Sequence, residues 1–239
     1  METLKSKLVQ YRAGHILEVG TGTGKFIPMM LNIFNGIDQI VGIDMDHDAL
    51  LEAKNTYIEN TKIDFVAMNA EQLSYEDHTF NTVCISNALH HMPPESKVLD
   101  EMKRVLKSEG LFLINELVCD GQNEAQLTHV MYHHFSAEID RRLGIYHHQT
   151  YTKQDVLDLI RDKGIRIEIV YEYNESKGNV RAEQDIVLVT EACRKHIERT
   201  KDLSDYIEFK RRGEEIIERL NTVGIQRPTQ LMVLGKVEA

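Results

Sequence analysis

The chain has no tryptophan, only four prolines and three cysteines, and no long run of apolar residues. Because Cys84, Cys119 and Cys193 are odd in number and far apart, they exclude a disulfide framework and a Cys-x-x-Cys metal site and favour a reducing compartment. No run of about 18 apolar residues occurs, and the start of the chain lacks the apolar core of a signal peptide. We therefore expect no membrane partner and a cytoplasmic location.

Basic residues are also scarce. The chain carries 28 lysines and arginines against 38 acidic residues, which gives a formal net charge of −10. Its longest basic run, residues 210–212, is flanked by acidic residues and is typical of a solvated helix face. Because nucleic-acid binding depends on Lys and Arg that neutralise phosphates, this composition argues against a nucleic-acid partner.

Short β-branched runs alternate with amphipathic segments along the chain. The predicted strands are His15–Val19, Gln39–Asp44, Ile63–Met68, Thr82–Ser86, Gly110–Leu117, Ile165–Tyr173 and Gln230–Lys236. The predicted helices between them are Lys25–Asn35, Asp48–Glu59, Glu95–Lys107, Asn123–Leu143 and Thr152–Lys163. Asp46 and Thr152 occupy N-cap positions, and Gly164 occupies a C-cap position. The alternation predicts an α/β fold, a doubly wound, seven-stranded, mostly parallel sheet within a single domain of residues 1–239.

Three glycines follow the first predicted strand, at positions 20, 22 and 24, and the second predicted strand ends in Asp44. Glycines let the backbone turn sharply and approach a ligand closely. A carboxylate at the end of the next strand can bind both hydroxyls of a ribose. The dinucleotide pattern Gly-x-Gly-x-x-Gly fails, because Lys25 or Ile27 occupies its third glycine position. The pattern therefore predicts a nucleotide site of another kind.

The segment Glu-x-Gly-x-Gly-x-Gly from Glu18 to Gly24 resembles the first motif of the class I S-adenosylmethionine-dependent methyltransferases, of the small-molecule, type 11/25-like kind. Three further segments are similar to that family, namely Asn69–Leu73, Thr79–Val83 and Ser86–Met92, with Asn69 and Asn81 where the family has Asp. The resemblance covers about residues 11–173 and the final strand. It implies a Rossmann-like methyltransferase fold and S-adenosyl-L-methionine as the cofactor.

The resemblance also implies roles for residues at the ends of the first four strands. Asp44 would hold the ribose, Met45 would pack on the adenine, and Ala70 would donate a backbone hydrogen bond to the ring. Glu18 would orient the glycine loop and reach toward the amino group of the methionine tail. The implied cofactor-binding set is Glu18, Gly20, Thr21, Gly22, Gly24, Asp44, Met45, Asn69, Ala70, Ser86 and Asn87.

Many of the eleven histidines fall where the substrate pocket is expected. An oxygen or nitrogen nucleophile needs a base of suitable pKa, which histidine usually provides. His90 and His91, after the fourth strand, and Glu116, at the end of the fifth, are therefore candidate catalytic residues. Ordinary core or surface histidines are one alternative to this interpretation.

A divalent metal site is a second alternative, although we expect no metal cofactor. Its ligands would be Glu116, His129, His133 and His147, since imidazole and carboxylate groups suit such ions. His129 and His133 are four residues apart and share one face of a predicted helix.

About fifty residues, 177–228, separate the last two predicted strands. Their apolar periodicity predicts helices over 181–199 and 203–223, inserted within the single domain. Such a pair must bury its apolar stripe. It would do so either on its own core, as a lid formed together with residues 121–151, or against a second copy as a homodimer interface.

The sequence thus predicts a methyltransferase that carries a methyl group from S-adenosylmethionine to an oxygen or nitrogen of a small-molecule acceptor. This chemistry requires a nucleophile held near attack distance and exclusion of water. Two alternatives stay open. One is a non-catalytic protein that binds S-adenosylmethionine or S-adenosylhomocysteine, and the other is a metal-assisted enzyme on the same fold that uses the histidines around His129 and His133.

Overall fold

The computed structural model describes residues 4–93, 97–174 and 178–237. Its strands are β1 (Arg12–Val19), β2 (Asn35–Asp44), β3 (Ile63–Ala67), β4 (Phe80–Ser86), β5 (Leu106–Leu117), β6 (Ile165–Tyr173) and β7 (Gln230–Val237). Its helices are α1 (Leu4–Leu8), α2 (Ile27–Ile33), α3 (His47–Thr56), α4 (Val98–Val105), α5 (Glu124–Arg142), α6 (Lys153–Asp162), α7 (Glu183–Arg199) and α8 (Tyr206–Thr222), with a 3-10 helix η1 (Leu89–His91).

The predicted strands and helices are all present, with ends shifted by a few residues. The predicted start of α4 at residue 95 lies outside the described residues. The short elements α1 and η1 were not predicted.

The seven strands form one sheet in the order β3-β2-β1-β4-β5-β7-β6. The pairs β1–β2, β1–β4, β2–β3 and β4–β5 are parallel, and β7 runs antiparallel to both β5 and β6. This arrangement confirms the predicted doubly wound, mostly parallel fold. The strand order reverses between β1 and β4, and ligands of such sheets bind at the carboxyl ends of the strands at that point.

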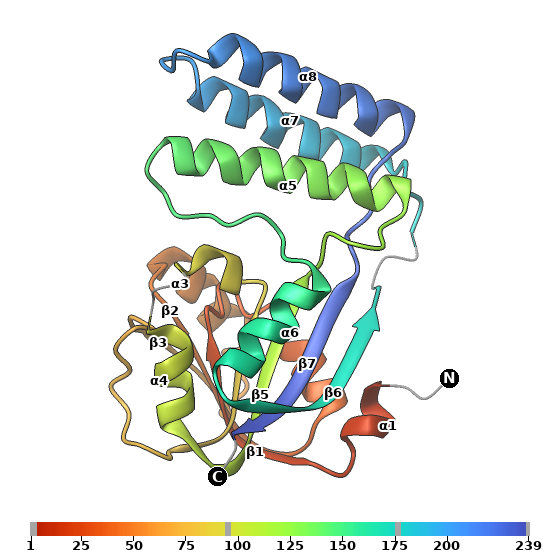
Figure 1. Ribbon diagram of the computed structural model, residues 1–239. Helices are drawn as coiled ribbons and strands as arrows, with labels where there is room; N and C mark the ends of the chain where they lie inside the picture. Colours follow the sequence, from red (N-terminus) through yellow and green to blue (C-terminus); the bar gives the residue numbers. More distant parts are fainter. Residues whose placement is uncertain (1–3, 94–96, 175–177, 238–239) are drawn as a thin grey trace.

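Helices cover both faces of the sheet (Figure 1). Successive strand residues point to opposite faces. Ile16 therefore lies in the apolar cluster that includes α1, α2 and α3, while Leu17 and Val19 lie in the cluster that includes α4 and α6. The sheet is thus buried on both sides, as its apolar runs predict.

The predicted helix caps are confirmed. Asp46 accepts hydrogen bonds from the backbone N–H groups of Asp48 and Ala49 at the start of α3. Thr152 forms a capping box with Asp155 at the start of α6, and Gly164 follows that helix with a φ of +65°. The cap at Asp46 leaves the neighbouring Asp44 free of that structural role, so its carboxylate is available to the site.

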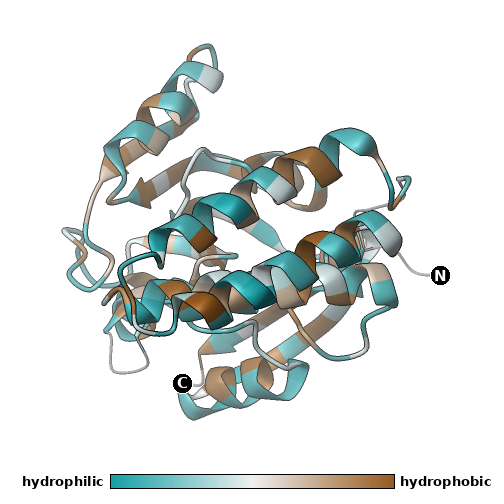
Figure 2. Cartoon of the chain, turned by 90° about the horizontal axis from the view of Figure 1, so that it is seen from above, coloured by the Kyte–Doolittle hydropathy of each residue, from teal (hydrophilic) through white to brown (hydrophobic). Residues whose placement is uncertain are grey.

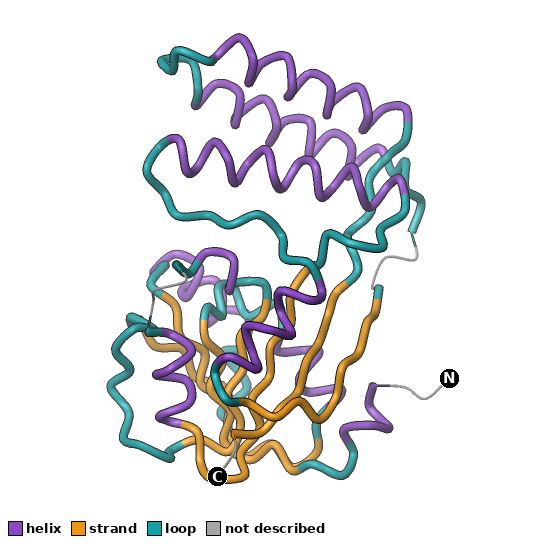
Figure 3. The backbone as a smooth tube through the Cα atoms, in the orientation of Figure 1, coloured by secondary structure: helices purple, strands orange, loops and turns teal. Residues whose placement is uncertain are grey.

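A third layer lies beyond the carboxyl ends of the strands, where α5, α7 and α8 run side by side (Figures 1 and 3). Each of these helices carries hydrophobic and hydrophilic residues along its length (Figure 2). Their apolar side chains form a separate cluster, which includes Phe135, Cys193, Phe209 and Leu220. The insertion therefore buries its apolar stripe on α5 of its own chain.

Close packing joins the two inserted helices. A Cβ atom at Gly213 in α8 would lie 2.4 Å from Cδ1 of Ile197 in α7, so glycine permits this approach. Arg212 pairs with Glu138 of α5 and lies over the rings of Phe135 and Phe209. These contacts fix the layer of α5, α7 and α8, which we call the helical cap.

None of the helices in the described residues is both long enough and apolar enough to cross a bilayer.

Candidate functional site

The glycine loop links β1 to α2 at the carboxyl edge of the sheet. Gly20 and Gly22 have φ values of +66° and +52°, a region that disfavours other residues. A Cβ atom at Gly20 would lie 2.6 Å from Cβ of Ala88, whereas one at Gly22 would have no neighbour within 4 Å. The loop thus packs on the end of β4 at Gly20 and is open to a ligand at Gly22.

Asp44 fastens this loop to the end of β2. Its Oδ2 accepts a hydrogen bond from the Gly22 N–H at 2.8 Å, and its Oδ1 accepts one from the Asp46 N–H at 3.0 Å. Each carboxylate oxygen has a second lone pair. The side chain can therefore hold the loop and still accept hydrogen bonds from two hydroxyl groups.

A cavity of about 620 Å³ opens beside Asp44, at the ends of β1, β2, β3 and β4. Its lining contains the residues that the family resemblance assigns to the ribose and adenine. These are Asp44, Met45, Asn69 and Ala70, and the lining also contains Gly20, Asn87 and His91. Oδ1 of Asn69 also accepts a hydrogen bond from the Glu71 N–H at 2.9 Å, so this side chain shapes the loop after β3. We call this space the first cavity.

A second cavity of about 370 Å³ lies on the other side of the glycine loop. It is lined by Glu18, Thr21, Gly22, Thr23, Lys25, Phe26, Met29, Ala49, Ser86, Asn87, Asn115, Tyr173, Arg227 and Gln230. Asn87 lines both cavities and has a φ of +50°. The two cavities therefore meet at the end of β4, where the strand order reverses.

Glu18 is the buried acid of the second cavity, with 1% of its surface exposed. Burial raises its pKa to about 7, although the hydrogen bond from Thr21 works in the opposite direction. That bond joins Thr21 Oγ1 to Glu18 Oε2 at 2.6 Å. A carboxylate desolvated to this degree is stabilised by a positive charge brought next to it.

The second cavity also contains polar residues that the sequence interpretation did not select. Tyr173 donates a hydrogen bond to Oδ1 of Asn115 at 2.9 Å, and Asn115 donates one to Ser86 Oγ at 2.9 Å. Arg227 is an exposed cation in the same lining. These residues lie at or near the ends of β5, β6 and β7. Their positions at the ends of predicted strands are the feature of the sequence from which they could have been selected.

The candidate catalytic residues occupy two different environments. His91 lines the first cavity, and burial lowers its pKa to about 4, with neighbouring histidines adding to the effect. His90 and Glu116 are both buried, and Nδ1 of His90 lies 3.0 Å from Oε2 of Glu116. The other oxygen of Glu116 accepts the Leu89 N–H at 2.8 Å. Glu116 thereby holds η1, and with it both histidines, at the end of β4.

The four ligands of the alternative metal site do not come together as expected from the sequence. His133 and His147 are neighbours, with their Nε2 atoms 3.3 Å apart, but the third histidine beside them is His90. His129 lies one turn earlier on α5 and lines a separate cavity with Ile225 and Arg227. The helical periodicity correctly placed His129 and His133 on one face of α5. It did not show that His147, in the segment after α5, would contact His133 and not His129.

Comparisons with known proteins agree with this geometry. Residues 17–114 match the family described as methyltransferase domain. Over 117 residues the chain is 31% identical to the phosphatidylethanolamine N-methyltransferase of Cereibacter sphaeroides. The aligned region covers 47% of this chain and 55% of that protein. Over 105 residues it is 33% identical to the ubiquinone/menaquinone biosynthesis C-methyltransferase UbiE of Haemophilus ducreyi, covering 42% of this chain and 40% of that protein. The chain thus spans about half the length, or less, of these curated relatives.

Solved structures extend the likeness to the whole fold. The structure of a SAM-dependent methyltransferase from Methanosarcina mazei superimposes with a TM-score of 0.60 at 16% identity, over 100% of this chain and 99% of that one. Domains of the matched family use S-adenosyl-L-methionine as their methyl donor. The chain is thus similar to methyltransferase domains over residues 17–114, and it shares the fold of the solved structure over its whole length.

Proposed function

We propose that this protein transfers the methyl group of S-adenosylmethionine to an oxygen or nitrogen atom of a small-molecule acceptor. The observation that carries the proposal is the meeting of the two cavities at Asn87, beside the open face of the glycine loop. An elongated ligand with a nucleoside at one end and an amino acid at the other fits two adjoining cavities better than one. The sulfonium would lie near their junction.

The nucleoside belongs in the first cavity. Asp44 faces it with two oxygens that each retain a lone pair, as two ribose hydroxyls require. Met45 is 68% exposed there, and an apolar side chain at this edge gains from covering an adenine ring. Ala70 and Asn69 follow β3 at the far side of the same cavity.

The amino-acid tail belongs in the second cavity. Glu18 is buried there, and a cationic amino group would favour its ionised form. Thr21, Gly22 and Ser86 complete the lining of this cavity, while the neighbouring Gly20 lines the first cavity. This placement directs the activated methyl toward the end of β4.

The polar lining supports an oxygen or nitrogen acceptor. Such acceptors carry hydrogen-bonding groups that must be matched when they leave water. His91 supplies such a partner beside the first cavity, whereas Tyr173, Asn115 and Arg227 line the second cavity, which we assign to the amino-acid tail. The two curated relatives are named for transfer to nitrogen and to carbon, so their names do not decide the acceptor atom.

The helical cap supports a small acceptor and a covered site. It lies over the carboxyl ends of the strands (Figure 1), and its apolar stripe is buried within the chain itself. We therefore favour the lid over the homodimer interface for the insertion predicted over residues 177–228. A cover of this kind excludes water from a reaction that hydrolysis would waste.

Calorimetric titration with S-adenosylmethionine and S-adenosylhomocysteine tests the cofactor site directly. We expect binding of one equivalent of each. A panel of small alcohols, phenols, amines and carbon nucleophiles, followed by the release of S-adenosylhomocysteine, then tests transfer. Absence of binding to the folded protein would refute the proposal. Binding with turnover of only the carbon nucleophiles would refute the choice of acceptor atom.

A further inference from the structure

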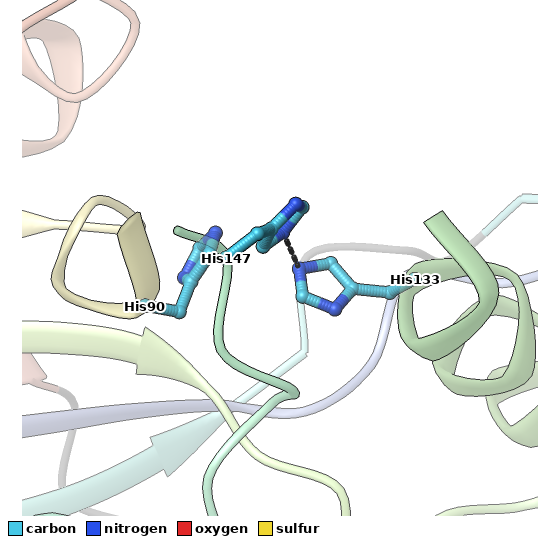
Figure 4. A group of neighbouring side chains, drawn as sticks. All are labelled: His90, His133 and His147. Atoms are coloured by element: carbon cyan, nitrogen blue, oxygen red, sulfur yellow. Dashed lines mark hydrogen bonds between the residues drawn. The ribbon is translucent and has the colours of Figure 1, made fainter. Parts of the chain in front are cut away.

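Three histidines from three separate elements converge beside η1. His90 belongs to η1, His133 to α5, and His147 to the segment between α5 and α6. One nitrogen from each ring lies within 4.8 Å of the corresponding nitrogens of the other two. Figure 4 shows the three rings gathered in one group, with ring centroids 4.9 to 5.5 Å apart. His90 and His147 are only 5% and 6% exposed.

Two carboxylates orient two of these rings. Nδ1 of His90 lies 3.0 Å from Glu116, and Nδ1 of His147 lies 2.7 Å from Asp140. Because a carboxylate accepts hydrogen bonds, each Nδ1 carries the proton and each Nε2 keeps its lone pair. Histidines that bind metals show this arrangement, in which the other nitrogen donates to a carboxylate.

The carboxylates are themselves held in place. The second oxygen of Glu116 accepts the Leu89 N–H at 2.8 Å. Oδ1 of Asp140 pairs with Arg199 of α7 at 2.6 Å. Both imidazoles are therefore positioned by groups anchored in the sheet edge and in the helical cap.

The spacing of one pair of ring nitrogens, those of His133 and His147, matches a tetrahedral ion. The Nε2 atoms of His133 and His147 are 3.3 Å apart. Two nitrogens at about 2.0–2.1 Å from a zinc ion with tetrahedral angles are about 3.3–3.4 Å apart. Nδ1 of His133 is buried and has no hydrogen-bond partner in the part of the chain that the structure describes. Within the described chain, no hydrogen bond at Nδ1 therefore fixes the tautomer of His133.

We propose that His90, His133 and His147 bind a divalent transition cation of the Zn²⁺ class through their Nε2 atoms. Imidazole ligands select such ions over Mg²⁺ and Ca²⁺, which prefer oxygen. Among the described residues no fourth His, Cys or carboxylate joins the group. Three protein ligands leave one position for water or for an oxygen or nitrogen of a bound molecule.

The site joins the helical cap to the methyltransferase core. His90 is held at the end of β4, while His133 belongs to the cap. His91 connects the site to the first cavity, because its ring centroid lies 4.3 Å from that of His147 and it also lines the cavity. His91 thus lies against both the histidine group and the first cavity.

Metal binding is tested on the full chain after removal of metals by chelator dialysis. Titration with ZnCl₂ in a calorimeter should show one equivalent, and CoCl₂ should give the strong visible bands of four-coordinate Co²⁺. His133→Ala and His147→Ala should each weaken Zn²⁺ binding by at least about 100-fold, since each removes a ligand. Glu116→Gln should weaken it by about 10- to 100-fold, as loss of an orienting carboxylate does.

His129→Ala is the matched control, because it removes a histidine one turn away on the same helix that lines another cavity. It should leave the Zn²⁺ stoichiometry and affinity unchanged. The inference is overturned if the folded wild-type chain binds no stoichiometric Zn²⁺, or if His133→Ala and His129→Ala behave alike. Titration with S-adenosylmethionine on the same samples is a separate readout, so failure of the metal site and failure of the proposed function are distinguishable.

Discussion

Replacing Asp44 with alanine should weaken the binding of S-adenosylmethionine more than any other single change at the first cavity. The substitution removes the acceptor of the Gly22 N–H at 2.8 Å, so the glycine loop loses its tie to β2. It also removes the acceptor that we propose for the ribose. A hydrogen bond to a charged group contributes about 1.5–3 kcal/mol, and this range corresponds to about a 10- to 150-fold increase in Kd.

Asp46→Ala provides the control for this prediction. Asp46 is two residues away and is also acidic, but its carboxylate caps α3 through Asp48 and Ala49. Loss of an N-cap costs about 1 kcal/mol of stability and should leave the Kd for the cofactor within about twofold. Calorimetric titration of both variants measures the difference, and thermal melts record the stability. Equal Kd values for Asp44→Ala and the wild type would refute the ribose assignment.

Two further predictions concern the buried acid and the helical cap. Because burial raises the pKa of Glu18 to about 7, the folded state holds this proton more tightly than the unfolded state. The resulting stabilisation of the folded state is complete below pH about 4.5, and about 3 kcal/mol of it is lost as the pH rises through about 7. Glu18→Gln should remove this pH dependence of the free energy of unfolding, measured by urea unfolding at a series of pH values. An unchanged pH dependence in the variant would contradict the assignment. Gly213→Val should lower the free energy of unfolding by about 1–3 kcal/mol through overpacking against Ile197, seen as a lower thermal midpoint with an unchanged Kd for S-adenosylmethionine. A midpoint equal to that of the wild type would show that the cap is looser than described.

The sequence was sufficient for those parts of the structure that depend on local patterns. The glycine spacing and the position of Asp44 at a strand end predicted the loop and the first cavity, because parallel strands align their carboxyl ends. The caps at Asp46 and Thr152 followed from residue type and position alone. Such features depend on neighbours in the chain, so a single sequence contains their signal.

The histidine site depended on contacts that a single sequence does not reveal. His147 reaches His133 because residues 143–150 return along α5, and His90 joins them because η1 turns it toward Glu116. Neither the return of that segment nor the short 3-10 helix has a periodic pattern. The expected partner His129 has the correct helical spacing from His133, but the packing of the cap places it beside Arg227 instead.

The pairing of β6 with β7 continues to the last residues before the insertion. Tyr173 and Gln230 are partners in the antiparallel register, so the two strand ends are as close as in an ordinary hairpin, where a turn of a few residues would join them. The insertion therefore leaves the sheet and returns to it at one point, so a change in its length does not require a change in the register of β6 and β7.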